Sequence, residues 1–565
     1  MNEKILEGLD DAQLRAVMTD STRVLVVAPP GSGKTRVLAS RFARLISEGV
    51  EPGKILAVTF TNRAGTEMRD RVGGLAGIEV RDLDIGTLHG FCLKVLKSLR
   101  PGLTLYGRAE QREVLRELGV KNPERGIERI SFMKNRFPSG AGKVVELDYE
   151  VFRLYRERLE REQALDLDDL ILEALSALEG GVYSPGFTHI MVDEFQDINP
   201  PQARLIKLLA LGGARLFAIG DPDQAIYAFR GADVKAFMDF EKEWPGSEVI
   251  RLTRNYRSPE KIVAASRALI SNNSTRVENE VVSTRGGGEI KLVGCPDEGS
   301  LAAFITREVE GLMGGLVSLT VGGGGGREGE RDRGGGSFRF SDFAVLYRTR
   351  AQAELISGAF GRSSIPCHVV SPPGPGFKEF LEHLRTLGPV PGIPLPDLVE
   401  REGRLIGAES LTLELFLRRA GGAGGAGGAG AREGEELESF IDAMQLLEPP
   451  DNLDIRADRV NLMTLHMAKG LEFRVVFIAG AEDGFIPMRR GETDVEEERR
   501  LFYVGMTRAK EKLYLLHARS RREWGRAEER TLSPFVDEIP EGLIETINLK
   551  KKTARRRPAQ KGLFE

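Results

Sequence analysis

Short runs of valine, isoleucine and leucine recur along this chain, and each is followed by a turn and then by a helical pattern. Continuous apolar runs of this length are typical of parallel strands that helices cover on both faces. Their alternation with helical segments predicts an α/β fold with doubly wound parallel sheets. The runs that define the first predicted sheet lie at residues 24–27, 55–58, 190–192 and 216–219.

A second set of apolar runs, at residues 343–346, 475–478 and 513–516, predicts a second α/β core of the same class. Strand-like runs disappear between about residue 95 and residue 182. Within that stretch, residues 151–178 are charged and their apolar residues are spaced three or four apart, which indicates helices. We therefore expect a helical insertion in the first core.

The composition narrows the class of protein. The 565-residue chain has a net charge of −4, so binding to nucleic acid would depend on local basic patches. Its three cysteines, Cys92, Cys295 and Cys367, lack the spacing of a zinc site or a disulfide framework. The N-terminal residues lack the apolar core of a signal peptide, and no apolar run approaches the length of a membrane span. We therefore expect a cytoplasmic protein that has no contact with a membrane.

Two low-complexity segments are expected to be flexible loops or linkers, because they contain too few apolar side chains to offset the entropy lost on ordering. The first consists of glycines at 322–326 and 334–336 around a charged run, and the second is a Gly-Gly-Ala repeat at 421–430. The C-terminal residues 550–557 include six lysines and arginines. Such a run is either a solvated tail or a nucleic-acid contact.

A phosphate-binding loop is predicted at residues 28–35, Ala-Pro-Pro-Gly-Ser-Gly-Lys-Thr, between the first apolar run and a helical segment. Glycines allow backbone N–H groups to turn inward around phosphates, and a helix N-terminus adds a partial positive charge. We expect Lys34 to reach the β- and γ-phosphates of a nucleotide and Thr35 to bind Mg²⁺. Ala28 stands where the first glycine of such a loop is usual.

Two adjacent acids, Asp193 and Glu194, follow the third apolar run. An acid at the end of such a strand can hold Mg²⁺, and its neighbour can activate the attacking water. A solvated acidic turn is the alternative. The phosphate loop earlier in the chain favours a site of nucleotide hydrolysis.

Residues 220–231 combine two chemistries in one short segment after the fourth apolar run. Gln224 suits the sensing of a phosphate, whereas Tyr227 and Phe229 suit stacking on bases, which contributes about 1–3 kcal/mol per base and tolerates any sequence. Phe60 is a similar candidate. Core packing is the alternative for Phe229, and it is less expected for Phe60 and Tyr227, which lie in polar turns after strands.

Two arginines beyond the first core, Arg257 and Arg508, are candidates for binding a transferring γ-phosphate. Tyr256, beside the first of them, could stack on adenine. Each arginine taken singly could be an ordinary surface charge, so this interpretation depends on the whole set of motifs.

Taken in order, from residues 9–13 to residues 508–510, these motifs resemble those of the UvrD/Rep/PcrA group of superfamily 1A DNA helicases. The resemblance covers most of the chain outside residues 386–455. It implies two RecA-like domains of the P-loop NTPase class that close on ATP and open after hydrolysis. It also implies Mg²⁺-dependent, ATP-driven stepping 3′→5′ along single-stranded DNA and at duplex junctions.

The resemblance assigns roles residue by residue. Gln13 resembles the adenine-reading glutamine, Gln224 the γ-phosphate sensor and Glu194 the catalytic base. Catalysis is thereby expected from Lys34, Glu194, Gln224, Arg257 and Arg508, and metal binding from Thr35 and Asp193. Nucleotide binding is expected from Gln13, Ala28, Pro29, Pro30, Gly31, Ser32, Gly33, Lys34, Thr35, Arg36, Tyr256, Arg257, Lys469, Glu472 and Arg508. DNA contacts are expected from Phe60, Thr61, Asn62, Thr87, His89, Tyr227, Phe229, Arg230 and His466.

The resemblance also implies a division into domains. The expected ranges are 1–94 and 183–253 for the first RecA-like domain, 95–182 for its helical insertion, called 1B, 254–385 and 456–540 for the second RecA-like domain, 386–455 for a reduced 2B-like insertion with a Gly/Ala linker, and 541–565 for a basic flexible tail.

The chain departs from the family pattern in places that bear on function. Ile198 stands where threonine is common and Phe229 where tryptophan is common, and the smaller ring of Phe229 is expected to stack less strongly on bases. Family members usually carry a large helical 2B subdomain where this chain has only about seventy residues. Translocation should survive that loss, because its residues lie elsewhere. The alternative function is therefore a translocase that strips proteins from single-stranded DNA and unwinds duplex poorly without a partner.

A third hypothesis is a nucleotide-binding scaffold that acts as a switch without motor activity. Glu194, Arg257 and Arg508 together argue against it, because a switch does not need all three. At the end of the chain, residues 560–564, Gln-Lys-Gly-Leu-Phe, resemble the short peptide by which bacterial replication and repair proteins bind the sliding clamp.

Overall fold

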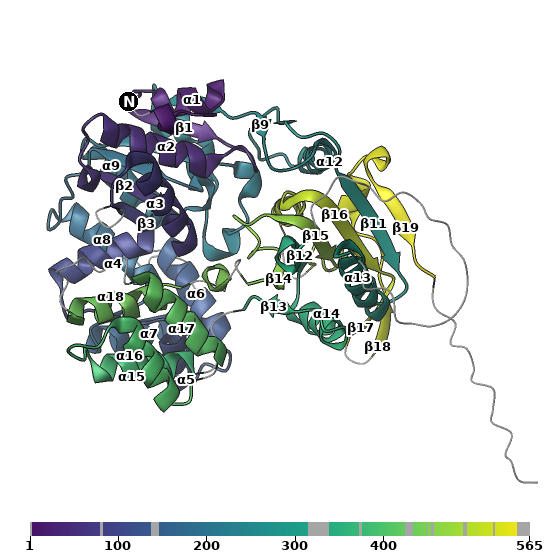
Figure 1. The fold of residues 1–565 in the computed structure, drawn as a ribbon. Coiled ribbons are helices and arrows are strands. Elements are labelled where there is room, and N and C mark those ends of the chain that lie inside the picture. Colours follow the sequence, from purple (N-terminus) through teal and green to yellow (C-terminus); the bar gives the residue numbers. More distant parts are fainter. Residues whose placement is uncertain are drawn as a thin grey trace, which may run out of the picture. The chain divides into compact units, whose positions relative to one another are not determined.

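The chain folds into two units, each built round a parallel sheet (Figure 1). The structure is a computed structural model that describes residues 3–79, 83–136, 146–314, 338–371, 376–408, 410–423, 433–447, 449–453, 457–489, 494–523 and 526–550. The first unit comprises Met1–Ser258, Asn273–Arg285 and Val370–Asp454. The second comprises Pro259–Asn272, Gly286–Val369 and Ile455–Glu565.

Six strands form the sheet of the first unit, in the order β3-β2-β6-β7-β1-β8 and all parallel. The strands are β1 (Arg23–Val27), β2 (Ile55–Thr59), β3 (Asp84–Thr87), β6 (His189–Val192), β7 (Arg215–Gly220) and β8 (Glu248–Arg251). Because the strands are parallel, their carboxyl ends and the loops that follow them meet at one edge of the sheet. The four apolar runs predicted as strands are confirmed.

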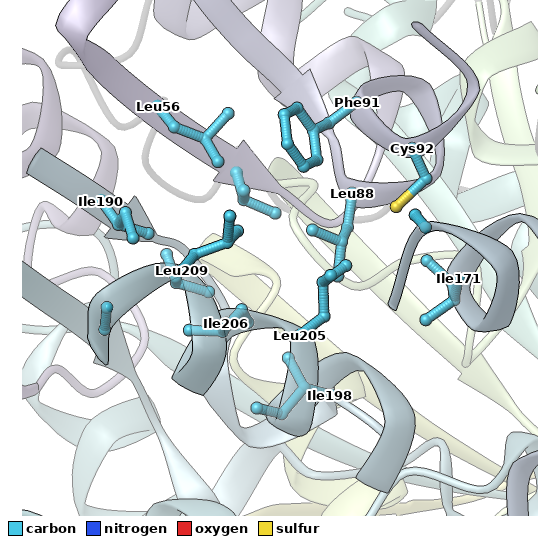
Figure 2. Packing of buried hydrophobic residues seen from close by; sticks show 14 of the residues in the cluster. Leu56, Leu88, Phe91, Cys92, Ile171, Ile190, Ile198, Leu205, Ile206 and Leu209 are labelled. Atoms are coloured by element: carbon cyan, nitrogen blue, oxygen red, sulfur yellow. The ribbon is translucent and has the colours of Figure 1, made fainter. Parts of the chain in front are cut away.

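Both faces of this sheet are buried, which explains why its strands are continuously apolar. Val24 and Val26 of β1 pack into one hydrophobic cluster, whereas Leu25 and Val27 pack into another. Figure 2 shows part of the second cluster, where Leu56 and Ile190 of the strands face residues of three covering helices. The labelled residues of those helices are Leu88, Phe91, Cys92, Ile171, Leu205, Ile206 and Leu209.

Several helices round this sheet start at capping side chains. Asp10 caps α1 (Asp11–Met18), and Asn199 caps α9 (Pro200–Leu211) through a reciprocal capping box. The other helices near the sheet are α2 (Lys34–Ser47), α3 (Asn62–Ala76), α4 (Leu88–Leu99), α10 (Lys235–Met238) and α11 (Phe240–Glu243). Two short strands, β9 (Arg254–Asn255) and β10 (Val282–Ser283), pair with each other.

The predicted helical insertion contains α5 (Arg108–Glu117), α6 (Pro123–Arg136), α7 (Glu146–Arg161) and α8 (Leu167–Glu179). The expectation that it lacks strands is wrong in one detail, because β4 (Thr104–Leu105) and β5 (Ala164–Leu165) pair in parallel. Two residues are too short a run to give a strand pattern. A small apolar core that includes Leu115, Tyr155 and Leu159 holds this insertion together.

The shortened insertion between the later strands is a folded element of four helices, α15 (Phe377–Leu387), α16 (Leu395–Leu405), α17 (Ser410–Ala423) and α18 (Glu433–Gln445). Its own core includes Phe380 and Phe416, whose rings stack at 4.5 Å between centroids. Ion pairs join it to the rest of the first unit, among them Lys97–Asp442 and Lys378–Glu113. The insertion therefore has a core of its own, although it is short.

Seven parallel strands form the sheet of the second unit, in the order β13-β14-β12-β15-β16-β11-β19. The strands are β11 (Glu289–Cys295), β12 (Phe343–Tyr347), β13 (Cys367–Val369), β14 (Val460–Thr464), β15 (Phe473–Ala479), β16 (Ala509–Ala518) and β19 (Glu545–Asn548). The helices are α12 (Glu260–Ile270), α13 (Glu298–Leu312), α14 (Arg350–Arg362), α19 (Val495–Met506) and α20 (Pro534–Asp537), and β17 (Ser520–Glu523) and β18 (Arg526–Glu529) form an antiparallel hairpin. The second α/β core and the overall fold class are confirmed.

Strand β19 corrects the predicted tail, which was expected to begin at residue 541. Residues Glu545–Asn548 pair with β11 as an edge strand, so the tail begins after them. The glycine-rich stretch at 322–336, most of the Gly-Gly-Ala repeat and the clamp-like residues 560–564 lie outside the described residues. Among the described helices, none is both long and apolar enough to cross a membrane.

Candidate nucleotide site and DNA-facing turns

The predicted phosphate loop connects β1 to α2, and α2 begins at Lys34. Gly31 and Gly33 have φ angles of +74° and +85°, which favour glycine. Space also demands glycine here, since a Cβ at Gly31 would lie 2.7 Å from the Cβ of Arg257 and one at Gly33 would lie 2.8 Å from Gln13 Nε2. The loop is thus held open at the N-terminus of a helix, where backbone N–H groups can bind an anion.

Lys34 lies between the loop and the acids at the end of β6. Its Nζ donates to Ala28 O at 3.0 Å and lies 4.0 Å from Glu194 Oε1. The side chains of Lys34 and Glu194 are both largely shielded from solvent. The structure therefore brings together the phosphate-binding cation and the catalytic base that the sequence predicts.

Gln13 is buried on α1 and its Nε2 donates to Ser32 O at 2.8 Å. Its backbone N–H donates to Asp10 Oδ1, and its Oε1 accepts from Asp10 N, so both ends of the side chain are fixed. Arg36, in the first turn of α2, donates to Glu7 O. Gln13 consequently contacts the phosphate loop directly, as a residue that reads a bound base should.

The stretch from Asn255 to Arg257 lies against the same loop. Asn255 Nδ2 donates to Pro30 O at 2.8 Å, and Tyr256 N donates to Gly31 O at 2.9 Å. The Tyr256 hydroxyl donates to Asp10 Oδ2 at 2.6 Å, and burial together with this carboxylate raises the pKa of Tyr256. Asn255 was not among the predicted site residues, yet its amide oxygen accepts from Arg257 N and Ser258 N while its amide nitrogen holds this stretch to the loop.

The two acids follow β6 directly, and the second has an unusual backbone. Glu194 has a φ of 49°, in the left-handed region that is costly for a residue other than glycine. Asp193 Oδ1 accepts from Glu194 N at 2.9 Å. Backbone strain of this kind is tolerated where a side chain needs a particular orientation. Here the left-handed backbone places the Glu194 carboxylate near Lys34.

A chain of buried hydrogen bonds joins Glu194 to the predicted phosphate sensor. Gln196 Nε2 donates to Glu194 Oε2 at 2.6 Å, while Gln196 Oε1 accepts from Asp221 N at 2.9 Å. Gln224 Nε2 then donates to Asp221 Oδ2 at 2.9 Å. Burial raises the pKa of Asp221, although Lys34 and the Gln224 amide oppose this.

Gln196 and Asp221 were not among the predicted site residues. Asp221 directly follows the apolar strand β7, which is a signal that the sequence carries, whereas Gln196 lies four residues after the end of β6. Gly220 is required beside them, because a Cβ there would lie 2.2 Å from Gln196 Oε1. The end of β7 and the side chain of Gln196 therefore lie in close contact.

The two aromatic side chains in the segment 220–231 differ in exposure, and Tyr227 is more buried than predicted. Tyr227 is only 7% exposed and its ring stacks on Phe60 at 4.7 Å, whereas Phe229 is 61% exposed. Core packing is thus wrong for Phe229 and correct for Tyr227, because the turn folds its first aromatic inward and its second outward. The Arg230 guanidinium lies 5.4 Å from the Tyr227 ring and 5.9 Å from the Phe229 ring. Phe229 and Arg230 form the part of the turn that can reach a base and a phosphate.

The other predicted DNA contacts of the first unit lie at helix starts. Thr61 Oγ1 caps α3 by accepting from Ala64 N, and Thr87 Oγ1 caps α4 by accepting from Gly90 N. Asn62 Nδ2 donates to Leu446 O at 2.9 Å and to Asp451 Oδ2 at 3.2 Å, both in the shortened insertion. His89 is half-buried in the first turn of α4.

In the second unit, Arg508 is one of the most completely buried side chains. Its guanidinium donates to Val504 O, Leu471 O and Thr507 Oγ1. Glu472 pairs with Lys510. His466 and Lys469 are half-buried in the turn after β14. The predicted residues of this unit therefore come from the ends of β14 and α19 and from the residues next to them.

The site has the oxygen donors that Mg²⁺ prefers, the Thr35 hydroxyl at the start of α2 and the Asp193 carboxylate at the end of β6. No group of three or more His, Cys, Asp or Glu side chains among the described residues could hold a metal alone. A Mg²⁺ ion that also binds substrate phosphates needs only one or two protein oxygens. Thr35 and Asp193 therefore fit such an ion.

Comparison with known proteins covers nearly the whole chain. Residues 9–245 match the UvrD/REP helicase N-terminal domain, and residues 250–377 and 428–520 match the UvrD-like helicase C-terminal domain. The unmatched residues 378–427 fall in the shortened insertion.

Individual relatives give the same result. The chain is 30% identical over 674 residues to the ATP-dependent DNA helicase PcrA of Bacillus subtilis, across 98% of this chain and 88% of the relative. It is 30% identical to PcrA of Leuconostoc citreum, across 96% and 86%, and 30% identical to PcrA of Staphylococcus aureus strain MRSA252, across 96% and 87%.

Proposed function

Because the chain belongs to the UvrD/Rep family and is an ATP-dependent DNA helicase, we propose that it steps 3′→5′ along single-stranded DNA in DNA repair or replication. The observation that carries this proposal is the hydrogen-bond chain from Glu194 to Gln224, which ends five residues before the exposed Phe229 in the same turn. A change at the catalytic acid can reach a DNA-facing aromatic through rigid, buried groups. A cytoplasmic location follows from the DNA substrate.

The residues round the phosphate loop take distinct roles in this proposal. Lys34 binds the β- and γ-phosphates of ATP, and Glu194 takes the proton of the attacking water. Arg257 and Arg508 bind charge that develops on the γ-phosphate. Mg²⁺, held through Thr35 and Asp193, would neutralise phosphate charge when bound. Phe229 stacks on a base. Each cycle of ATP binding and hydrolysis moves this contact along the strand.

The alternative is a translocase that strips proteins from single strands and unwinds duplex poorly without a partner. The observation that favours it is the shortened insertion, which lacks a match to the family over residues 378–427. The decisive experiment compares single-strand translocation with strand displacement on one preparation. Translocation with strand displacement supports a helicase that acts alone. Translocation without it supports the alternative.

Glu194→Gln is the control that tests the mechanism in both assays. The amide keeps the size of the side chain but cannot accept a proton, so ATP and DNA binding should persist while DNA-stimulated hydrolysis falls at least about a hundredfold. Turnover of ATP at the wild-type rate in this variant would contradict the assignment of Glu194 as the base.

We also propose that residues 560–564 bind the sliding clamp, because an extended peptide that ends in Leu-Phe suits insertion into an apolar pocket. Deletion of residues 560–565 should abolish capture of the chain on immobilised clamp. A Leu563→Ala, Phe564→Ala variant should also lose capture. Capture equal to that of the intact chain would contradict the proposal.

A further inference from the structure

Two buried polar residues, Lys134 and Asn135, lie in the last turn of α6 in the helical insertion of the first unit. Lys134 Nζ pairs with Asp166 Oδ2 at 2.6 Å and with Asp169 Oδ2 at 2.7 Å. Asp166 also accepts from the Tyr155 hydroxyl at 2.9 Å and caps α8. These bonds tie α6, α7 and α8 into one block, which fixes where Asn135 lies.

Asn135 uses both ends of its amide. Its Nδ2 donates to Asp168 Oδ1 at 2.8 Å and to Ser131 O at 2.9 Å, inside the insertion. Its Oδ1 accepts from Asn199 Nδ2 at 2.8 Å, outside the insertion. Asn199 lies five residues after Glu194 and caps α9. The amide therefore joins the insertion to the segment that carries the catalytic base.

The same side chain also lies close to the last residue of the DNA-facing turn. That turn ends at Gly231, which has a φ of +84°, and a Cβ there would lie 3.4 Å from the Cβ of Asn135. Just beyond, Asp233 N donates to Ile198 O at 3.1 Å, which ties the turn to the residue before Asn199. Asn135 is thus hydrogen-bonded to the segment after the acids and lies beside Gly231, the last residue of the turn that exposes Phe229.

We infer that Asn135 is a positioning residue that couples DNA stacking on Phe229 to ATP hydrolysis at Glu194. Burying an amide requires desolvation, which an apolar side chain does not. In return, the directional hydrogen bonds of the amide fix the position of the two segments relative to each other. The helical insertion is the rigid element that holds the turn and the acids in a defined relative position. This inference rests on the proposed function, since it takes Phe229 as a DNA contact.

The test is a pair of isosteric substitutions. Asn135→Asp keeps an oxygen that can accept from Asn199, but it places a second carboxylate against Asp168. Adding Asp168→Asn restores a donor and an acceptor across that contact, with the two groups exchanged. Asn122→Asp is the matched control, because Asn122 is an exposed residue of the same insertion whose oxygen caps α6.

We expect N135D to lower the stimulation of ATP hydrolysis by single-stranded DNA about tenfold and to raise the ATP consumed per nucleotide travelled, a size typical of coupling between two sites. DNA-independent hydrolysis should stay within about twofold, and N135D/D168N should recover most of the stimulation. N122D should behave as the wild type.

Three outcomes would overturn the inference: full stimulation and normal coupling in N135D, an equal loss of DNA-independent hydrolysis, or no recovery in a double variant that melts at the wild-type temperature. A wild-type chain that DNA does not stimulate would overturn the proposed function itself, so the two failures are distinguishable.

Discussion

Phe229 and Tyr227 lie two residues apart in one turn, yet only the first presents its ring to solvent. Replacing Phe229 with alanine should weaken binding to single-stranded DNA by about 1–3 kcal/mol, the contribution of one stacked base. Phe229→Trp should strengthen binding, because the larger ring stacks over more area. Fluorescence anisotropy with a labelled oligothymidine would measure both. An unchanged dissociation constant for F229A would show that the ring serves another purpose.

His189, at the start of β6, makes stability depend on pH. Burial, followed by the charges of Arg215, Arg41 and Arg44, lowers the pKa of His189 to about 4. An unfolded histidine titrates near 6.5, so the folded state gains stability from neutral His189 above that pH and loses it as the pH falls toward 4.

His189→Asn removes this titration, while an amide oxygen can still accept from Thr188, whose hydroxyl lies 2.9 Å from His189 Nδ1. We expect the melting temperature of the wild type to fall more than that of H189N between pH 7.5 and pH 5. Parallel curves for the two proteins over this range would contradict the assignment.

At the scale of elements, truncating a core side chain of the shortened insertion is predicted to unfold the insertion while the rest of the first unit stays folded. Phe416 is fully buried and its ring packs on those of Phe380, Phe377 and Phe440. Phe416→Ala should cost about 3–5 kcal/mol, the usual range for a buried phenylalanine. That loss falls on four short helices with a small core, so hydrogen exchange should accelerate over residues 377–445.

Leu405→Ala is the control for this prediction, because Leu405 is 74% exposed and its loss should change stability by less than about 0.5 kcal/mol. ATP hydrolysis without DNA should persist in F416A, since the phosphate loop lies in a separate core. Protection that is lost equally across β1 and α2 would show that the insertion and the sheet unfold together.

The elements that could be predicted from sequence are those whose burial leaves a pattern. Strands such as β1 were found because neighbours like Val24 and Leu25 pack on opposite faces and both must be apolar. Strand β19 was missed because it lies at an edge, where one side of its backbone and most of its side chains meet solvent.

The candidate site could be predicted where chemistry is fixed by local spacing, as in the phosphate loop. It could not be predicted where a residue's role depends on a partner far along the chain. Gln196 acts through Asp221, and Asn135 through Asn199, 64 residues away. Tyr227 was predicted to be exposed like Phe229 but is buried, since only the folded turn decides which ring points inward.

At the scale of the whole molecule, charge is unevenly distributed along the chain. Residues 550–565 contain seven lysines and arginines and one glutamate, so removing this net +6 from a chain of net −4 leaves −10. We expect truncation after Leu549 to weaken binding to single-stranded DNA at low salt, because the remaining chain repels the phosphates. The difference should vanish near 0.5 M salt, where charges are screened. Equal affinities at 20 mM salt would mark the tail as a solvated segment only.

The strand order of the second sheet has a consequence in time. Strand β11 lies between β16 and β19, and both neighbours are translated roughly 200 residues or more after it. At a synthesis rate of about 5–20 residues per second, β11 waits about 10–40 seconds on the ribosome before either partner emerges. During that interval its backbone groups are unpaired on both sides and open to pairing with another chain. Its place between β16 and β19 secures this strand in the finished protein, yet it leaves the strand waiting longest for its partners while the protein is made.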